Sequence, residues 1–190
     1  MYRAITDIGE VRRYLSGSPI ISFDFETASD DPYRGEERAA LDPHKSHIVG
    51  VSFSVAEGDG IYVPMAHRVG GNADPAAMME VLAEFAADTS VIKVAHNLFF
   101  EAMFLYAQGI VIQPPVYDTI AAAQMTLKSA TEFRGLADSG LKTLTPELLG
   151  VELPSFAEVT NGRFFDELNP VDPETVRYST PTSKPRTRRI

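Results

Sequence analysis

Two carboxylates at the end of an apolar run are the residues of this chain with the clearest potential for chemistry. Asp24 and Glu26 stand two positions apart, directly after the apolar stretch 20–23. On a strand, residues i and i+2 point to the same side. Two acids side by side at the end of a buried strand repel each other and lose solvation, so they need a compensating cation, and a divalent metal ion is the natural candidate. An isolated Asp-x-Glu is also typical of a solvated strand end, so the hypothesis needs partners elsewhere in the chain.

A second pair of polar residues follows a later apolar segment. Asn97 and Glu101 lie four residues apart, so they share one face of a helix that opens just after the predicted strand 91–95. In open α/β sheets, the carboxyl ends of the strands and the neighbouring helix starts form the usual crevice. We therefore expect the end of the first strand and the start of this helix to face each other. The alternative is that Glu101 is a solvated helix residue and Asn97 is only an N-cap.

The elements that must position these residues follow from periodicity and from turn and cap signals. Three consecutive strands come first, the second and third joined by the turn sequence at 57–60, and later strands alternate with helices. This order predicts an α/β fold with a mixed five-stranded sheet, an antiparallel hairpin at one edge and helices on both faces. The predicted strands are 20–25, 47–55, 61–64, 91–95 and 110–116. Two helices are predicted at 6–15 and 97–108, and three more open at Asp74-Pro75, at Asp118 and at Asp172-Pro173.

Composition indicates a single intracellular domain. The chain has 190 residues, no cysteine and a net charge of −9, which is long enough for one core and agrees with a reducing, cytoplasmic location. No apolar run approaches the ~20 residues that span a bilayer, so we expect no membrane association. The acidic balance argues against a sequence-blind duplex-binding protein coated in Lys and Arg, but a metal site lined by carboxylates is itself acidic and can act on nucleic acid.

Taken together, the polar motifs resemble a known family. The similarity is to the 3′–5′ exonuclease domain of family A DNA polymerases, in the DnaQ-like, ribonuclease-H-like superfamily, and it extends from the first strand through Tyr178. The matching motifs are Phe23-Asp24-Phe25-Glu26-Thr27, Ala95-His96-Asn97 with Phe100-Glu101, Tyr117-Asp118-Thr119, and Gly140-Leu141-Lys142-Thr143-Leu144.

This resemblance implies a two-metal phosphodiesterase that acts on single-stranded or frayed DNA 3′ ends. It assigns Asp24, Glu26 and Glu101 as metal ligands, although Asp is more usual at the position of Glu101, and it assigns Tyr178 to orienting the attacking water. Hard oxygen ligands suit Mg²⁺ or Mn²⁺. Asp118 is interpreted as a helix cap rather than a ligand. The four histidines are too scattered for a zinc site: they are His44, His47, His67 and His96.

Further residues of the same motifs are candidates for substrate binding. They are Phe25, Thr27, Asn97 and Phe100. Aromatic faces at Phe25, Phe99 and Phe100 are suited to stacking on the bases of a frayed 3′ end. Phenylalanines are usually core residues, however, and we expect at least two of these three to be buried in the core.

The last motif of the family is broken in this sequence. The family pattern is Tyr-x-x-x-Asp, yet Thr182 stands four residues after Tyr178, and Pro181 disrupts the helix that would carry the fourth acid. Residues 180–190 also carry four basic side chains and no acid, whereas 1–179 has a net charge of −13. We therefore divide the chain into an exonuclease domain, 1–179, and a basic, proline-containing tail, 180–190.

A frameshift is one hypothesis for this tail. Restoring one deleted base in codon 179 allows Tyr-Ser-Asp-Ala-Asp, which has the family spacing, and the tail would then replace the end of a longer polymerase. The alternative is a native basic tail that contacts DNA phosphates. Two other functions remain open: an RNA-trimming exonuclease of the same superfamily, and a nucleic-acid-binding module that keeps the fold without catalysis.

Overall fold

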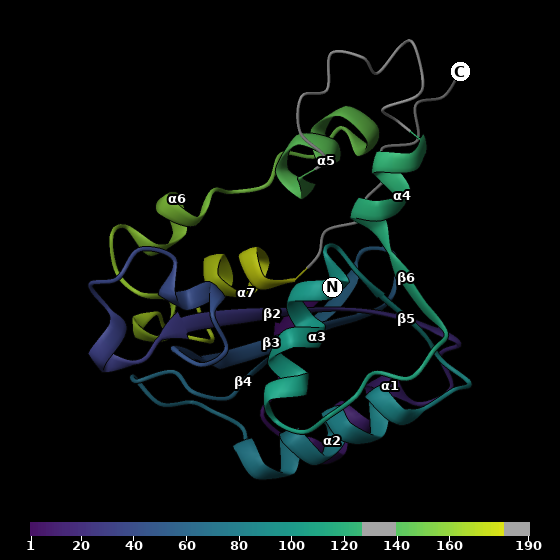
Figure 1. Ribbon diagram of the computed structural model, residues 1–190, viewed down its shortest axis with the longest axis horizontal. Coiled ribbons are helices and arrows are strands. Elements are labelled where there is room, and N and C mark those ends of the chain that lie inside the picture. The colour runs from purple at the N-terminus through teal and green to yellow at the C-terminus, as the bar shows by residue number, and fades with distance from the viewer. Residues whose placement is uncertain (127–139, 181–190) are drawn as a thin grey trace.

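A computed structural model describes residues 1–126 and 140–180 of the chain. In it a mixed, twisted sheet separates two groups of helices (Figure 1). The strand order is β1-β4-β3-β2-β5-β6. The strands are β1 (Tyr2–Ala4), β2 (Ile20–Ser29), β3 (Ser46–Ala56), β4 (Asp59–Pro64), β5 (Ile92–Ala95) and β6 (Val116–Asp118).

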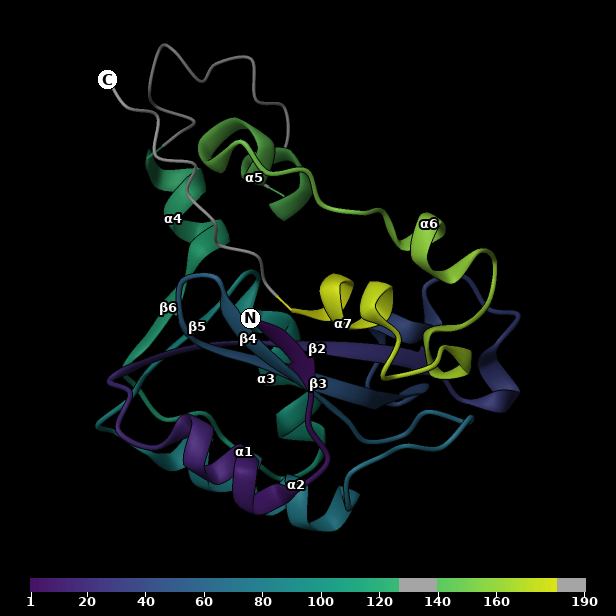
Figure 2. The same ribbon diagram turned by 180° about the vertical axis from the view of Figure 1, so that it is seen from behind.

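Helices lie on both faces of this sheet, as the sequence predicted. Seen from either side, α1 and α2 lie below the sheet and α7 lies above it (Figures 1 and 2). The helices are α1 (Ile8–Leu15), α2 (Pro75–Ala87), α3 (Leu98–Ala107), α4 (Thr119–Thr126), α5 (Leu141–Leu149), α6 (Phe156–Thr160) and α7 (Pro173–Ser179), with short 3₁₀ turns η1 (Asp31–Tyr33), η2 (Ala39–Leu41) and η4 (Phe165–Glu167).

Several helix starts are fixed by the residues that the sequence indicated. Asp74 accepts hydrogen bonds from the N–H groups of Ala76 and Ala77, and Pro75 occupies the first turn of α2. Asp172 caps α7 in the same way, through the N–H of Glu174. Such caps satisfy donors that have no partner inside the helix, so they set where each helix begins. Among the described residues, no helix has the length and apolar character needed to cross a bilayer.

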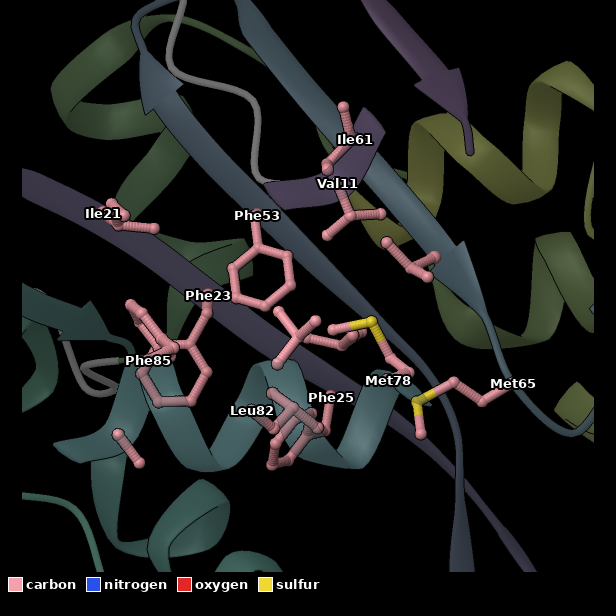
Figure 3. Packing of buried hydrophobic residues seen from close by; sticks show 14 of the residues in the cluster. Val11, Ile21, Phe23, Phe25, Phe53, Ile61, Met65, Met78, Leu82 and Phe85 are labelled. Carbon is pink, nitrogen blue, oxygen red and sulfur yellow. The ribbon is translucent and has the colours of Figure 1, made fainter. Parts of the chain in front are cut away.

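The main core lies between the sheet and α2. Phe23 and Phe53 each pack edge-to-face against Phe85 of α2, with ring centroids 5.2 and 5.4 Å apart. Figure 3 shows these rings, together with Phe25 and Leu82, between the strands and the helix. Full burial of such a side chain contributes about 1.5–3 kcal/mol, so this layer anchors β2, the strand that carries Asp24 and Glu26.

A smaller cluster lies on the opposite face, beneath α7. Tyr62 and Phe165 are fully buried there and are packed with Val49, Leu168 and Val176. This cluster seats α7 against β1, β2 and β4. The sheet is therefore covered on the face that holds the two acids as well as on the face that holds the phenylalanines.

Two strand predictions need correction. The sheet has six strands rather than five. The unpredicted strand, β1, has only three residues, too few for an alternating pattern, and it pairs in parallel with β4 outside the β3–β4 hairpin. The last strand was predicted at 110–116, but β6 begins at Val116. Pro114 and Pro115 have no N–H to donate to a ladder, while Ile110 and Ile112 pack against the core from outside the sheet.

Candidate active site

A β-bulge shapes the end of β2 where the two acids stand. Glu26 pairs with Gly50 of β3, whereas the next residue, Thr27, pairs with Ile48, so the register shifts between them. Bulges re-aim side chains and are frequent beside active sites. Asp24 and Glu26 are partly buried and point away from the main core, because Phe23 and Phe25 occupy the alternate positions. The sequence prediction that the two carboxylates share one face is confirmed.

Glu101 reaches the same place from α3. Strand β5 runs parallel to β2, with Val94 opposite Ser22, so α3 begins beside the end of β2 that carries the acids. Glu101 is only 1% exposed, and its carboxyl group lies within hydrogen-bonding contact of Asp24. The alternative of a solvated helix residue is therefore wrong for Glu101.

Asp118 fixes the start of α3. One carboxylate oxygen accepts the N–H of Asn97 (2.9 Å) and the N–H of Ile120 (3.0 Å), and the other accepts the N–H of Leu98 (3.0 Å). Asp118 thus caps α4, as predicted, and also holds the loop that leads into α3. Its oxygens are committed to backbone donors, which agrees with a capping role rather than a ligand role.

Burial and mutual repulsion raise the pKa values of the acid cluster. Burial raises the pKa of Asp24 to about 6. Burial, together with the charge of Asp24, raises the pKa of Glu101 to about 9. Burial and the same Asp24 charge raise the pKa of Glu26 well above its ordinary value. Each shift has the sign expected for acids placed together without sufficient positive charge.

The donor set suits a hard divalent cation. Glu101 Oε2 is buried and has no hydrogen-bond partner among the described residues, which is costly unless something else satisfies it. Carboxylate oxygens are the preferred ligands of Mg²⁺ and Mn²⁺. In the described part of the chain no three His, Asp or Glu side chains converge closely enough to hold a metal as they stand. An ion bound by Asp24, Glu26 and Glu101 would therefore have to draw these side chains together, in exchange for the protons that they hold.

Tyr178 and Ser179 close the cluster from α7. The charges of Glu26 and Asp24 add to burial in raising the pKa of Tyr178, so its phenol stays protonated across the physiological range. Its ring packs against Phe165, with centroids 5.8 Å apart. The hydroxyl of Ser179 contacts the carboxylate of Glu26 and lowers its pKa, partly offsetting the effect of burial. The structure thus places Tyr178 beside the acids, where the sequence predicted it.

A cleft of about 730 Å³ opens onto these residues. Asp24, Glu26 and Tyr178 lie along it, and much of the remaining wall is apolar. Such a site, concave and mostly apolar with a few converging polar groups, is typical of ligand binding. The apolar part of the wall includes Leu41, Phe100, Leu141, Leu149, Leu153 and Phe156.

The predicted substrate-binding residues have different outcomes. Phe100 lines the cleft and is partly buried against Phe104. Thr27 also lines the cleft, but its hydroxyl donates to the carbonyl of Ala40 (2.7 Å). The ring of Phe25 lies in the main core and is only 4% exposed, so it is not available to a base. Phe100 is only partly buried and Phe99 is 70% exposed, so Phe25 alone of the three is a buried core residue, and the expectation of at least two is wrong.

Asn97 needs correction as a substrate-binding candidate. Its side chain is exposed and is not among the residues that line the cleft. Its backbone has φ 78°, in the left-handed region, and its side chain makes no capping hydrogen bond. Asparagine tolerates this conformation better than most residues, so the tight entry into α3 is a sufficient reason for Asn97.

Sequence reasoning missed two residues of this site. Ser179 contacts Glu26, and Lys142 of α5 lines the cleft with its ammonium nitrogen 5.4 Å from the centre of the Tyr178 ring. Ser179 directly follows Tyr178, and Lys142 lies inside the motif segment 140–144, but neither residue type by itself indicates a role. Thr182, the position of the missing fourth acid, lies outside the described residues, as does the tail from 181 onward.

Comparison with known proteins agrees with this geometry. The family model of the 3′–5′ exonuclease matches residues 2–180. The chain therefore belongs to the 3′–5′ exonuclease family.

Curated relatives of the chain include bacterial DNA polymerases. DNA polymerase I of Chloroflexus aurantiacus is 28% identical over 123 residues, covering 65% of this chain and 12% of the polymerase. DNA polymerase I of Pseudomonas aeruginosa is 26% identical over 160 residues, covering 73% of this chain and 16% of the polymerase. The chain thus spans less than a fifth of the length of these relatives.

Solved structures share the fold at low sequence identity. Trypanosoma brucei RNase D superimposes with a TM-score of 0.65 at 15% identity, over 94% of this chain and 59% of that one. Brucella melitensis NrnC with bound Mg²⁺ superimposes with a TM-score of 0.60 at 18% identity, over 93% of this chain and 70% of that one. The ribonuclease-H-like exonuclease fold predicted from the sequence is confirmed.

Proposed function

We propose that this chain is a metal-dependent 3′–5′ exonuclease that removes nucleotides from DNA 3′ ends, with Asp24, Glu26, Glu101 and Tyr178 as its catalytic residues. The observation that carries the proposal is a set of three neighbouring acids with raised pKa values: Asp24 and Glu26 lie at the wall of a large cleft, and Glu101 is buried beside Asp24. DNA is favoured over RNA because the relatives that match at 26–28% identity are DNA polymerases.

The residues divide the work of phosphodiester hydrolysis. Asp24, Glu26 and Glu101 would hold Mg²⁺ or Mn²⁺, which when bound supplies an activated water and stabilises the leaving oxygen. Tyr178 keeps its proton, so its O–H can donate a hydrogen bond that orients the attacking water. Ser179 lies beside Glu26 and lowers the pKa of its carboxyl group, while its hydroxyl donates to the carbonyl of Thr175 (3.0 Å). Phe100 and the neighbouring apolar wall offer faces on which the terminal bases can stack.

The test is strand shortening by matched variants. A 5′-labelled single strand of DNA is incubated with Mg²⁺ or Mn²⁺, and product length is followed on a gel. Wild type should give a ladder that shortens from the 3′ end. Glu101→Gln and Asp24→Asn should each lose at least about 100-fold in rate, because loss of even an outer-shell metal partner costs 10–100-fold. Glu80→Gln makes the same chemical change on the exposed surface of α2 and should retain full activity.

Other outcomes of this assay separate the alternatives. Equal rates for wild type and Glu101→Gln would refute the assigned site. Binding of the strand without shortening would favour a non-catalytic module. An RNA strand of the same sequence, run in competition, decides between the DNA hypothesis and RNA trimming, a candidate favoured by the structural likeness to T. brucei RNase D.

The tail remains a separate proposal. We propose that 180–190 replaces the segment that carries the fourth acid in the parent of this chain, a polymerase with a domain following the exonuclease. Two observations support this: the family match ends at residue 180, and the charge balance changes there. Sequencing the coding DNA tests it. A +1 or −1 reading frame that continues into polymerase sequence is expected, and a gene whose native frame encodes Thr182 with no such frame would refute it.

A further inference from the structure

Lys142 is the one strong positive charge among the described residues that line the cleft; the wall there contains no arginine and no other lysine. The cleft must nevertheless accept a phosphodiester chain if the proposed function holds. Two acids, Asp24 and Glu26, and one lysine line the cleft, so the placement of that lysine is informative.

The contacts of Lys142 leave its charge uncommitted. Its ammonium nitrogen lies 5.4 Å from the centre of the Tyr178 ring. Among the described residues it makes no ion pair within 4.0 Å, although its charge lowers the pKa of Glu26 and contributes to the lowered pKa of Glu158. A purely structural lysine is typically paired or fully solvated, as Lys45 is paired with Glu36. Lys142 is exposed to solvent as well, but it lines the cleft and its ammonium group lies over the aromatic ring of a candidate catalytic residue.

Its position on α5 suits a contact with substrate. Lys142 stands in the first turn of α5 and lies over Tyr178 of α7. Its charge also lowers the pKa of Glu26, so the ammonium group lies near the acids as well as over Tyr178. A backbone phosphate that approaches Asp24, Glu26 and Tyr178 along the cleft would pass close to it.

We propose that Lys142 binds a backbone phosphate of the nucleic acid strand whose 3′ end lies at the acid cluster. The inference rests on the proposed function. An ammonium group acts on phosphate as a point charge. It would also offset the repulsion between the strand and the carboxylates, so that the acidic cleft accepts an anionic substrate before the acids are fully neutralised.

The experiment measures binding and cleavage with charge-matched variants. Binding of a short 5′-fluorescein-labelled oligodeoxythymidine is followed by anisotropy in Ca²⁺, at several salt concentrations. Lys142→Met keeps the aliphatic stem on Tyr178 but removes the charge, and Lys142→Gln serves as a second neutral variant. Lys142→Arg keeps the charge. Arg13→Met removes one exposed positive charge from α1, on the far face of the sheet.

Lys142→Met and Lys142→Gln should weaken binding about tenfold, the size expected for one hydrogen bond to a charged group. The slope of log K against log salt should fall by about 0.7, the value for one phosphate contact on a single strand. Lys142→Arg should restore most of both, and Arg13→Met should leave both as in wild type. A neutral variant that keeps the wild-type affinity and slope overturns the inference, as does Lys142→Arg behaving like Lys142→Met.

The two proposals fail separately. If wild type does not shorten DNA but Lys142→Met weakens binding with the reduced slope, the exonuclease proposal fails and the phosphate contact stands. If wild type shortens DNA and Lys142→Met cleaves and binds equally well, only the phosphate contact fails. If Lys142→Met alters cleavage but leaves the salt slope of binding unchanged, Lys142 acts only as a counter-ion of Glu26, and the inference is overturned.

Discussion

Two buried carboxylates on this fold are held in opposite ways. Both are almost fully buried: the side chain of Asp166 is 1% exposed, and the whole residue Glu101 is 1% exposed. Asp166 accepts hydrogen bonds from two guanidinium groups, those of Arg34 and Arg68, the latter at 2.7 Å. Glu101 faces two other acids, Asp24 and Asp118. The charge of Asp166 is compensated within the described chain and that of Glu101 is not, although each carboxylate has one buried oxygen without a hydrogen-bond partner among the described residues, Oδ1 of Asp166 and Oε2 of Glu101.

The difference separates a structural ion pair from a site prepared for a ligand. Arg34 also bonds Asp31 and Glu167, and its guanidinium lies 4.1 Å from the centre of the Phe164 ring, so the Asp166 network ties the loop after β2 to η4. A buried charge survives in a fold only if it is paired or neutralised. At Asp166 the fold supplies the partner. At Glu101 the raised pKa keeps a proton on the carboxyl group at neutral pH.

The largest expected effect contrasts the two carboxylates directly. Asp166→Asn should lower the free energy of unfolding by about 2–3 kcal/mol, because it leaves two guanidinium groups without their buried partner. This cost is smaller than that of breaking a fully buried ion pair, because the arginines are partly exposed. Glu101→Gln should leave stability unchanged or raise it, because the side chain it replaces already holds a proton at neutral pH. Urea unfolding of both variants, without metal, gives the comparison.

A control for this prediction exists in the same network. Asp31 contacts the same two arginines, but its side chain is 70% exposed, so Asp31→Asn should cost far less than Asp166→Asn. If Glu101→Gln destabilised the metal-free protein as much as Asp166→Asn does, Glu101 would be a structural residue and the comparison would be broken.

The sequence predicts the acid cluster better than it predicts the ion network. Asp24 and Glu26 lie two apart on one strand, so local periodicity is enough to place them on one face. The prediction that Asn97 shares a helix face with Glu101 is wrong, because Asn97 precedes α3 in a left-handed conformation and is exposed, whereas Glu101 is buried. The caps at Asp74, Asp118 and Asp172 are equally local signals, and the structure confirms them. Arg34 and Asp166 are separated by 132 residues, and no local pattern pairs them.

Other features depend on tertiary contacts that a sequence does not display. The three-residue β1 exists only because β4 offers it a partner. The burial of Phe25 in the main core follows from the same strand alternation that turns Asp24 away from that core, so one strand assignment contains both facts. The contact of Lys142 with Tyr178 joins α5 to α7, and neither helix indicates it alone.

The smallest expected effect is a pH dependence of stability, which arises from Asp24 and Glu101 and not from the ion pairs of Asp166. Burial raises the pKa of Asp24 from 3.8 to about 6, and burial with the Asp24 charge raises that of Glu101 from 4.5 to about 9. At a pH between its ordinary pKa and its raised pKa, each carboxyl group keeps a proton in the folded chain that it has released in the unfolded chain. The stability contributed by these groups is therefore complete below about pH 4 and is lost as pH rises towards 9, by at most about 1.4 kcal/mol per pH unit for each group.

Thermal unfolding in EDTA at several pH values measures this slope. The melting temperature of the metal-free protein should fall between about pH 5 and pH 8.5, and excess Mg²⁺ should flatten the decline, because the cation replaces the protons and stabilises the folded state by mass action. Glu101→Gln should reduce the slope above about pH 6, because it removes one of the groups that still titrate there, whereas Glu80→Gln should keep the wild-type slope. A melting temperature that rises over this range without metal would mean that the acids are already compensated within the fold. Glu101 would then resemble Asp166, and the distinction between the two clusters would fail.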